Sequence, residues 1–98
     1  MTISTLVEFE AAVATLTPYQ KRVLSVIEKW PNQMANTWEV CESGFNSQWK
    51  ANRASHGAMF RSVLQAAQRM EKLGLITILS PRDRFDTYTY CSRRKWMK

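Results

Sequence analysis

Few residues in this chain could carry out catalytic or metal chemistry. His56 is the only histidine, and Cys41 and Cys91 lie far apart with no CxxC pair. A zinc site needs about four such ligands at short spacing. A catalytic nucleophile needs a base within hydrogen-bond reach, and the adjacent pair Ser55 and His56 is only a weak indication of one. The sequence also lacks a Gly-rich phosphate loop, HExxH and GxSxG. We therefore expect no enzyme, no metal and no cofactor, and two reduced, partly buried thiols.

Positive charge in the second half of the chain is the stronger chemical signal. The net charge is +6, and residues 1–49 carry three basic against five acidic side chains. Residues 50–98 carry eleven basic against three acidic ones. This asymmetry predicts one face that binds a polyanion such as nucleic acid, although a basic half can also be merely solvated.

The composition and the first residues limit which class of protein this chain can belong to. With 98 residues, 45% of them hydrophobic, the chain is expected to fold as a single domain over 1–98. The first sixteen residues have no basic n-region and include Glu8 and Glu10, so they do not resemble a signal peptide. No apolar run approaches the length of a membrane span. We expect a soluble, cytoplasmic protein with no membrane partner.

Capping residues and apolar periodicity predict two helices in the first third of the chain. The first runs from a Ser4 or Thr5 cap to about Leu16. The second opens at Thr17, where Pro at the first helical position and Gln three residues after the cap form a start signal. An apolar stripe from Tyr19 to Trp30 follows at helical spacing, and Pro31 stops the helix.

A short helix, a long helix and a hairpin are predicted after that. Asn36, with Glu39 three residues later, starts a helix over Thr37–Glu42 that Ser43-Gly44 ends, and residues 45–54 are expected to be mainly loop. Residues 55–73 form the longest helix, capped by Ser55 and closed by Gly74. Strands over 75–79 and 86–91 flank a turn at 80–85, and the basic tail 92–98 is expected to be frayed.

This order of elements, and the junction Met70-Glu71-Lys72-Leu73-Gly74-Leu75-Ile76, resembles the winged-helix family of transcription regulators. Its members often carry an apolar-Glu-x-x-Gly-Leu-apolar signature where the recognition helix meets the wing. The resemblance covers roughly residues 17–91. It implies a mainly α fold with a C-terminal β-hairpin, a winged helix-turn-helix that binds double-stranded DNA.

The resemblance makes 55–73 the recognition helix and 76–91 the wing. Helix residues facing the bases would be His56, Arg61, Ser62 and Gln65, with Arg82 and Arg84 at the wing tip. Arg and Gln suit guanine and adenine edges through their paired donors and acceptors. Further cations are expected to contact phosphates or to be solvated: Lys50, Arg53, Arg69, Arg93 and Arg94.

Two alternatives accompany this DNA-binding hypothesis. A winged-helix adaptor or inhibitor would instead dock its basic surface on an acidic protein, with Trp49 or Trp96 as its anchor. Such a module would show an exposed apolar patch interrupting the basic face. Binding of single-stranded nucleic acid is a third reading. A homodimer through Leu6–Leu16 is also expected, because one small module contacts few base pairs.

Overall fold

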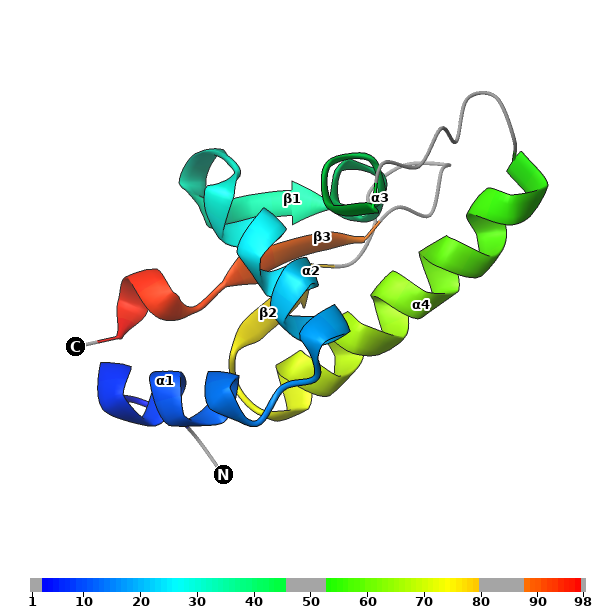
Figure 1. The fold of residues 1–98 in the computed structure, drawn as a ribbon. Helices are drawn as coiled ribbons and strands as arrows, with labels where there is room; N and C mark the ends of the chain where they lie inside the picture. Colours follow the sequence, from blue (N-terminus) through cyan, green and yellow to red (C-terminus); the bar gives the residue numbers. More distant parts are fainter. Residues whose placement is uncertain (1–2, 46–52, 80–87, 98) are drawn as a thin grey trace.

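The computed structural model describes residues 3–45, 53–79 and 88–97, with the side chains of 53–58 outside that description. Figure 1 shows helices arranged around a small sheet. The described residues form four α-helices. In chain order the elements are α1 (Leu6–Ala14), α2 (Pro18–Lys29), the 3-10 turn η1 (Pro31–Gln33), β1 (Met34–Asn36), α3 (Thr37–Phe45), α4 (Arg53–Lys72), β2 (Ile76–Leu79), β3 (Thr89–Ser92) and η2 (Arg94–Trp96). The predicted fold class, mainly α with a C-terminal antiparallel strand pair, is confirmed, and the arrangement is compatible with a winged helix-turn-helix.

Local capping signals place the starts of α2 and α3 where the sequence predicts them. The Thr17 hydroxyl accepts the Gln20 amide at 3.2 Å, and the Gln20 side chain accepts the Thr17 amide at 3.0 Å. Asn36 and Glu39 form the same reciprocal pair, with both hydrogen bonds at 2.8 Å. Each pair satisfies two backbone donors that a helix start otherwise leaves without a partner.

The end of α4 is also as predicted. Gly74 has φ of 82°, in the left-handed region that favours glycine. Its amide donates to the Glu71 carbonyl, and the Leu75 amide donates to the Met70 carbonyl, both at 3.0 Å. This is the Schellman arrangement, with the buried Leu75 and Met70 side chains completing it. The chain therefore leaves α4 directly into β2.

Three helix boundaries differ from the prediction by two residues or more. α1 ends at Ala14 instead of about Leu16. α3 continues past Glu42 to Phe45, because Gly44 packs on α2 rather than ending the helix: a Cβ there would lie 2.9 Å from the Val26 Cγ2. α4 begins at Arg53, so Ser55 lies inside the helix and is not its cap. The loop predicted over 45–54 is therefore wrong at both ends, since helix occupies Phe45, Arg53 and Ala54.

The sheet has the order β1-β3-β2, with both pairs antiparallel. β1 was not predicted from the sequence; it pairs Ala35 with Tyr90. β2 starts at Ile76, and β3 covers Thr89–Ser92, while the predicted turn and residues 86–87 lie outside the described residues. The Ile78 amide, in edge strand β2, donates to the Glu71 carboxylate at 2.9 Å. That contact covers part of an edge that could otherwise pair with another chain.

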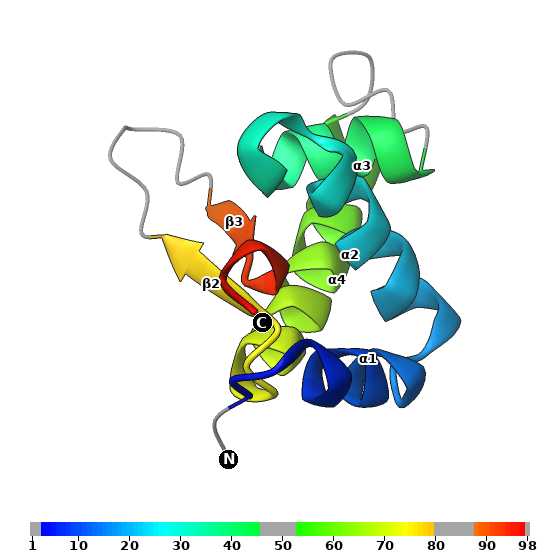
Figure 2. The same ribbon diagram turned by 90° about the vertical axis from the view of Figure 1, so that its left-hand side faces the viewer.

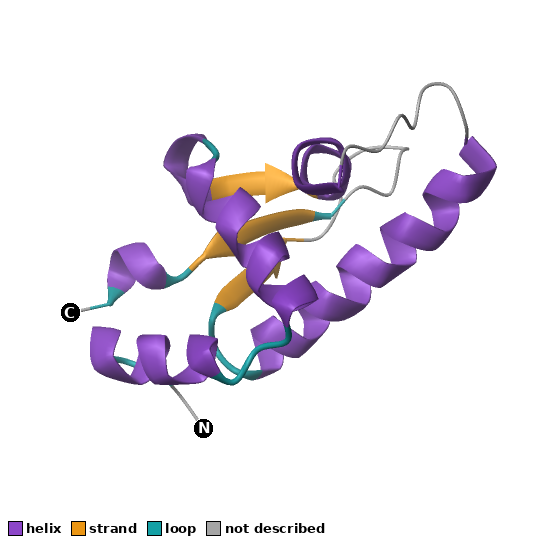
Figure 3. Ribbon diagram, in the orientation of Figure 1, coloured by secondary structure: helices purple, strands orange, loops and turns teal. Residues whose placement is uncertain are grey.

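Figures 2 and 3 show the helices packed beside the small sheet. The buried side chains that these elements contribute form one hydrophobic core. Its largest fully buried side chains include Tyr90, Phe9, Ile27, Met70 and Leu75. Both cysteines are buried and unpaired, as predicted. Trp30, at the end of the predicted apolar stripe, is only half-buried and packs against this core.

The tail was predicted to be frayed, and this is wrong for its described part. Ser92 belongs to β3, and residues 94–96 form η2. The Lys95 ammonium donates to the Asn32 carbonyl at 3.0 Å. Polar side chains therefore hold the tail to α2 and the turn after it, which local sequence patterns do not show.

Candidate nucleic-acid interface

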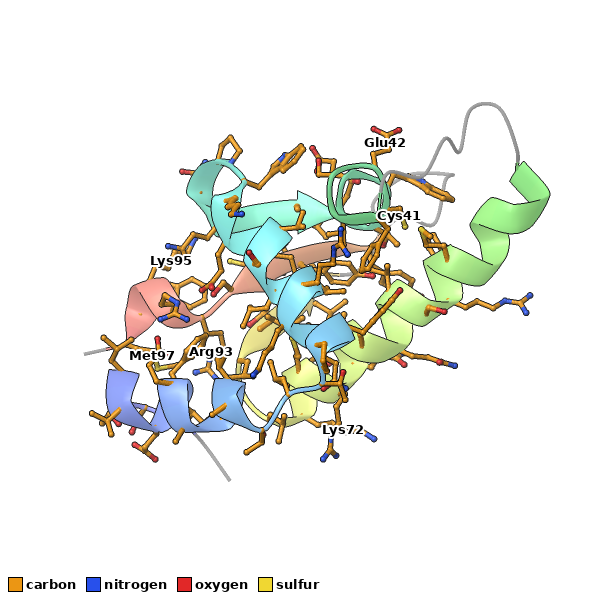
Figure 4. The ribbon with its side chains drawn as sticks, in the orientation of Figure 1. Cys41, Glu42, Lys72, Arg93, Lys95 and Met97 are labelled. Atoms are coloured by element: carbon orange, nitrogen blue, oxygen red, sulfur yellow. The ribbon has the colours of Figure 1, made fainter. Side chains whose placement is uncertain are left out.

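The outer face of α4 carries a row of exposed polar and basic side chains. Val63, Ala67 and Met70 face the core and are completely buried. Because an α-helix repeats every 3.6 residues, the positions on the opposite side of the helix turn outward. The exposed residues on this face are Arg61, Ser62, Gln65, Gln68, Arg69 and Lys72. Glu71 is exposed as well, but its carboxylate accepts the Ile78 amide of β2 at 2.9 Å. In Figure 4, Lys72 projects away from the body of the molecule at the end of α4.

The basic side chains on this face keep their charge available. Both salt bridges within the described part of the chain belong to Arg94, so no described carboxylate pairs with Arg61, Arg69 or Lys72. None of the large apolar side chains found exposed among the described residues lies on α4. This face, hereafter the α4 face (61, 62, 65, 68, 69 and 72), offers cations and amides without an apolar interruption.

The start of α2 continues the α4 face on one side. A shallow groove of about 330 Å³ is lined by Thr17, Tyr19 and Gln20 of α2 and by Ser62, Gln65 and Ala66 of α4. Tyr19 stacks on Phe45, with ring centroids 4.7 Å apart. The Arg22 guanidinium lies 5.2 Å from the centroid of the same Phe45 ring. Phe45, the last residue of α3, therefore positions the Tyr19 phenol and the Arg22 guanidinium beside α4.

The Tyr19 hydroxyl stays protonated at neutral pH. Burial raises the pKa of Tyr19, the neighbouring Cys41 raises it further, and a hydrogen bond with Ser62 lowers it in part. The net direction is upward from 10.0. A protonated phenol is a hydrogen-bond donor, which suits an anionic oxygen.

The two tail arginines proposed as phosphate contacts are placed differently. The Arg94 Nε donates to Glu28 at 2.6 Å, its Nη1 pairs with Glu10, and its guanidinium lies 4.6 Å from the Phe9 ring centroid. Burial, the largest single influence, lowers the pKa of Arg94, but the hydrogen bonds and charges of the two carboxylates together outweigh it. The net direction of the pKa is upward. Arg93 is half-buried and donates to the Gly74 carbonyl at 3.4 Å. Arg94 thus ties the tail to α1 and α2.

For the remaining predicted contacts, either the residue or its side chain lies outside the described part of the chain. Lys50, Arg82 and Arg84 lie outside the described residues. Arg53 and His56 are in the first turns of α4, but their side chains are outside the description. Of the predicted set, the structure brings Arg61, Ser62, Gln65 and Arg69 together on one face.

Sequence reasoning missed Arg22 and the outward position of Tyr19. It assigned Tyr19 to the core-facing stripe of its helix, whereas the residue is 36% exposed. Helical periodicity places Tyr19 near the buried Val23. Only the packing of α2 against α3 and α4 shows that the first turn of α2 borders a groove.

The described residues contain no group of three or more His, Cys, Asp or Glu side chains that could hold a metal ion. Among these same residues, no helix combines the length and the apolar character that crossing a membrane requires.

Comparison of the chain with protein-family models, with curated proteins and with solved structures finds no match. The winged-helix resemblance therefore stays a prediction. The functional argument depends on the arrangement of side chains on and beside α4.

Proposed function

We propose that this protein binds double-stranded DNA and that α4 enters the major groove. The observation that carries the proposal is the α4 face, on which Arg61, Gln65 and Arg69 are exposed on one side of a 20-residue helix. A major groove about 12 Å wide admits one α-helix. Arg pairs with guanine through two hydrogen bonds, and Gln does so with adenine.

Electrostatics supports a polyanion as the partner. The net charge is +6, and the cations of the α4 face have no ion-pair partner among the described carboxylates. Lys and Arg side chains that neutralise phosphates release condensed counter-ions, which drives association at low salt. The same cations would hold the helix in register along the groove.

A small transcriptional regulator of bacterial, phage or plasmid origin, acting in the cytoplasm, is the role that fits such binding. A second copy of the chain would double the number of base pairs contacted. α1 remains the candidate contact for that dimer: Leu6 and Val7 are 40% and 81% exposed, whereas Phe9 is completely buried.

The adaptor alternative is favoured less by the arrangement of apolar side chains. An adaptor would interrupt the basic face with an exposed apolar patch. The most exposed large apolar side chains of the described residues, Val7 and Trp96, lie on α1 and η2 instead of α4. They are 81% and 56% exposed. Trp96, one of the two anchors expected of an adaptor, is thus exposed without interrupting the α4 face, and Trp49, the other, lies outside the described residues.

Two double variants with the same loss of charge test the proposal. Arg61→Gln with Arg69→Gln removes two cations from the α4 face, and Lys21→Gln with Lys29→Gln removes two from α2. Lys21 and Lys29 are exposed and line a different groove, with Val13 and Arg94. We expect the α4 variant to lose about 1–3 kcal/mol of duplex binding per base contact, with the α2 variant near wild type. Equal losses would contradict the assignment of α4 to the groove.

A further inference from the structure

We propose that Tyr19 and Arg22, in the first turns of α2, contact a phosphate of the DNA strand that borders the groove on the α2 side of α4. This inference rests on the proposed function and adds to it a second contact surface, hereafter the α2 flank (Tyr19 and Arg22, with Phe45 supporting them). The α2 flank would bind phosphate oxygens, so it would supply affinity for any duplex and no choice of sequence.

The geometry of a groove requires such a flank. A helix in the major groove has a phosphate backbone on each side, so a protein bound there meets two strands. α4 packs against β2 on one side and against α2 on the other, as Figure 2 shows. The strand on the α2 side would therefore run past the first turns of α2.

The residues found there have the chemistry that a phosphate needs. Arg22 is exposed, and no described carboxylate pairs with it. A guanidinium presents parallel N–H donors that match two phosphate oxygens. The Tyr19 phenol adds a neutral donor, and a hydrogen bond with Ser62 links it to the α4 face.

The α2 flank is already ordered in the free protein. Phe45 is half-buried against the core, and it fixes the Tyr19 ring at a centroid distance of 4.7 Å and an interplanar angle of 21°. The same ring lies 5.2 Å from the Arg22 guanidinium. Side chains held in place before binding lose less conformational entropy on association.

The chain offers a matched control next to Arg22. Lys21 is exposed on the same helix, yet it lines the groove that contains Val13, Glu28 and Arg94. Arg22→Gln and Lys21→Gln remove the same charge from adjacent positions. Affinity of each variant for a random-sequence duplex is measured by fluorescence anisotropy over a range of salt concentrations.

Arg22→Gln is expected to reduce the magnitude of the slope of log K against log salt by about 0.9, the value for one phosphate contact. If the variant and the wild type bind equally well in 1 M salt, that slope change makes the variant bind about 8-fold more weakly than the wild type at 0.1 M. Lys21→Gln should keep the wild-type slope. Tyr19→Phe keeps the stacked ring but loses the neutral donor, so it should weaken binding about 2- to 10-fold without changing the slope.

Three outcomes separate this inference from the proposed function. Wild-type binding with a reduced slope for Arg22→Gln alone supports the α2 flank. Wild-type binding with equal slopes for Arg22→Gln and Lys21→Gln overturns the α2 flank and leaves the α4 assignment standing. If the wild-type protein does not bind the duplex, the proposed function and this inference both fail.

Discussion

The hydroxyl groups of Thr37 and Tyr90 lie 2.8 Å apart, and both side chains are completely buried. Thr37 is the first residue of α3, and Tyr90 lies within β3, the central strand of the sheet. The Thr37 amide also donates to the Tyr88 carbonyl at 3.0 Å. These bonds fix the start of α3 against the sheet and so set how α3 and Phe45 meet the rest of the fold.

Substitutions at Thr37 and Tyr90 should therefore differ in cost. Thr37→Val would leave the buried Tyr90 hydroxyl without its partner, and we expect a loss of about 1–3 kcal/mol in the free energy of unfolding. Tyr90→Phe should cost less, about 0.5–1.5 kcal/mol, because the Thr37 hydroxyl keeps the Tyr88 carbonyl at 3.3 Å. Urea unfolding measures both. A larger loss for Tyr90→Phe would contradict this explanation.

Gly44 should not tolerate a side chain while Val26 is present. Its added Cβ would lie 2.9 Å from the Val26 Cγ2, so Gly44→Ala overpacks the contact between α2 and α3. We expect a loss of about 1–3 kcal/mol on thermal or urea unfolding. The double variant with Val26→Ala should be more stable than the two single losses added together predict. Simple additivity would mean that the Gly44 contact is not the cause.

Arg94 should act in stability rather than in DNA binding. Arg94→Gln breaks its contacts with Glu28 and Glu10, and we expect about 1–2 kcal/mol less stability, since these partly exposed pairs are screened by solvent. The salt slope of duplex binding should stay at its wild-type value. A slope reduced by about 0.9 with unchanged stability would instead make Arg94 a phosphate contact.

The protein should lose stability at alkaline pH. Burial, aided by Glu42, raises the pKa of Cys41 from 9.0 to about 11, and burial raises the pKa of Tyr90 from 10.0 to about 12. Well below pH 9, the ordinary pKa of the thiol, both groups are neutral in both states, so their full contribution is present. Above that pH the unfolded chain releases its protons first, and unfolding becomes favoured.

Cys41→Ala provides the test of this pH dependence. It should remove about 1 kcal/mol of the stability lost between pH 8 and pH 10, measured by urea unfolding at the two pH values. An identical loss in the wild type and in Cys41→Ala would show that the thiol does not titrate differently in the two states.

Features that depend on neighbouring residues were predictable from the sequence. The reciprocal caps of Thr17 with Gln20 and of Asn36 with Glu39 join positions three apart. The end of α4 at Gly74 depends on the left-handed backbone conformation that glycine adopts easily. Features that depend on distant partners were not. β1 exists because Ala35 meets Tyr90 across the chain, and three residues are too few to show alternation.

The candidate site divides in the same way. The α4 face follows from helical spacing, so Arg61, Gln65 and Arg69 were expected on one side. The α2 flank arises because Tyr19 stacks on Phe45 and forms a hydrogen bond with Ser62. Both partners are distant in the sequence, so no local pattern predicts these contacts. The ion pairs of Arg94 were not predictable for a related reason, since its two carboxylates come from α1 and α2.

The central claim is that this protein binds duplex DNA through α4. The most direct test is a salt titration of wild-type binding to a random duplex, to the protein's own upstream region and to matched single strands, by fluorescence anisotropy. We predict duplex binding at about 50 mM salt that weakens with a log–log slope steeper than about −2.5, as three or more phosphate contacts require. No duplex binding at that salt concentration, or single strands bound as tightly as duplex, would contradict the claim.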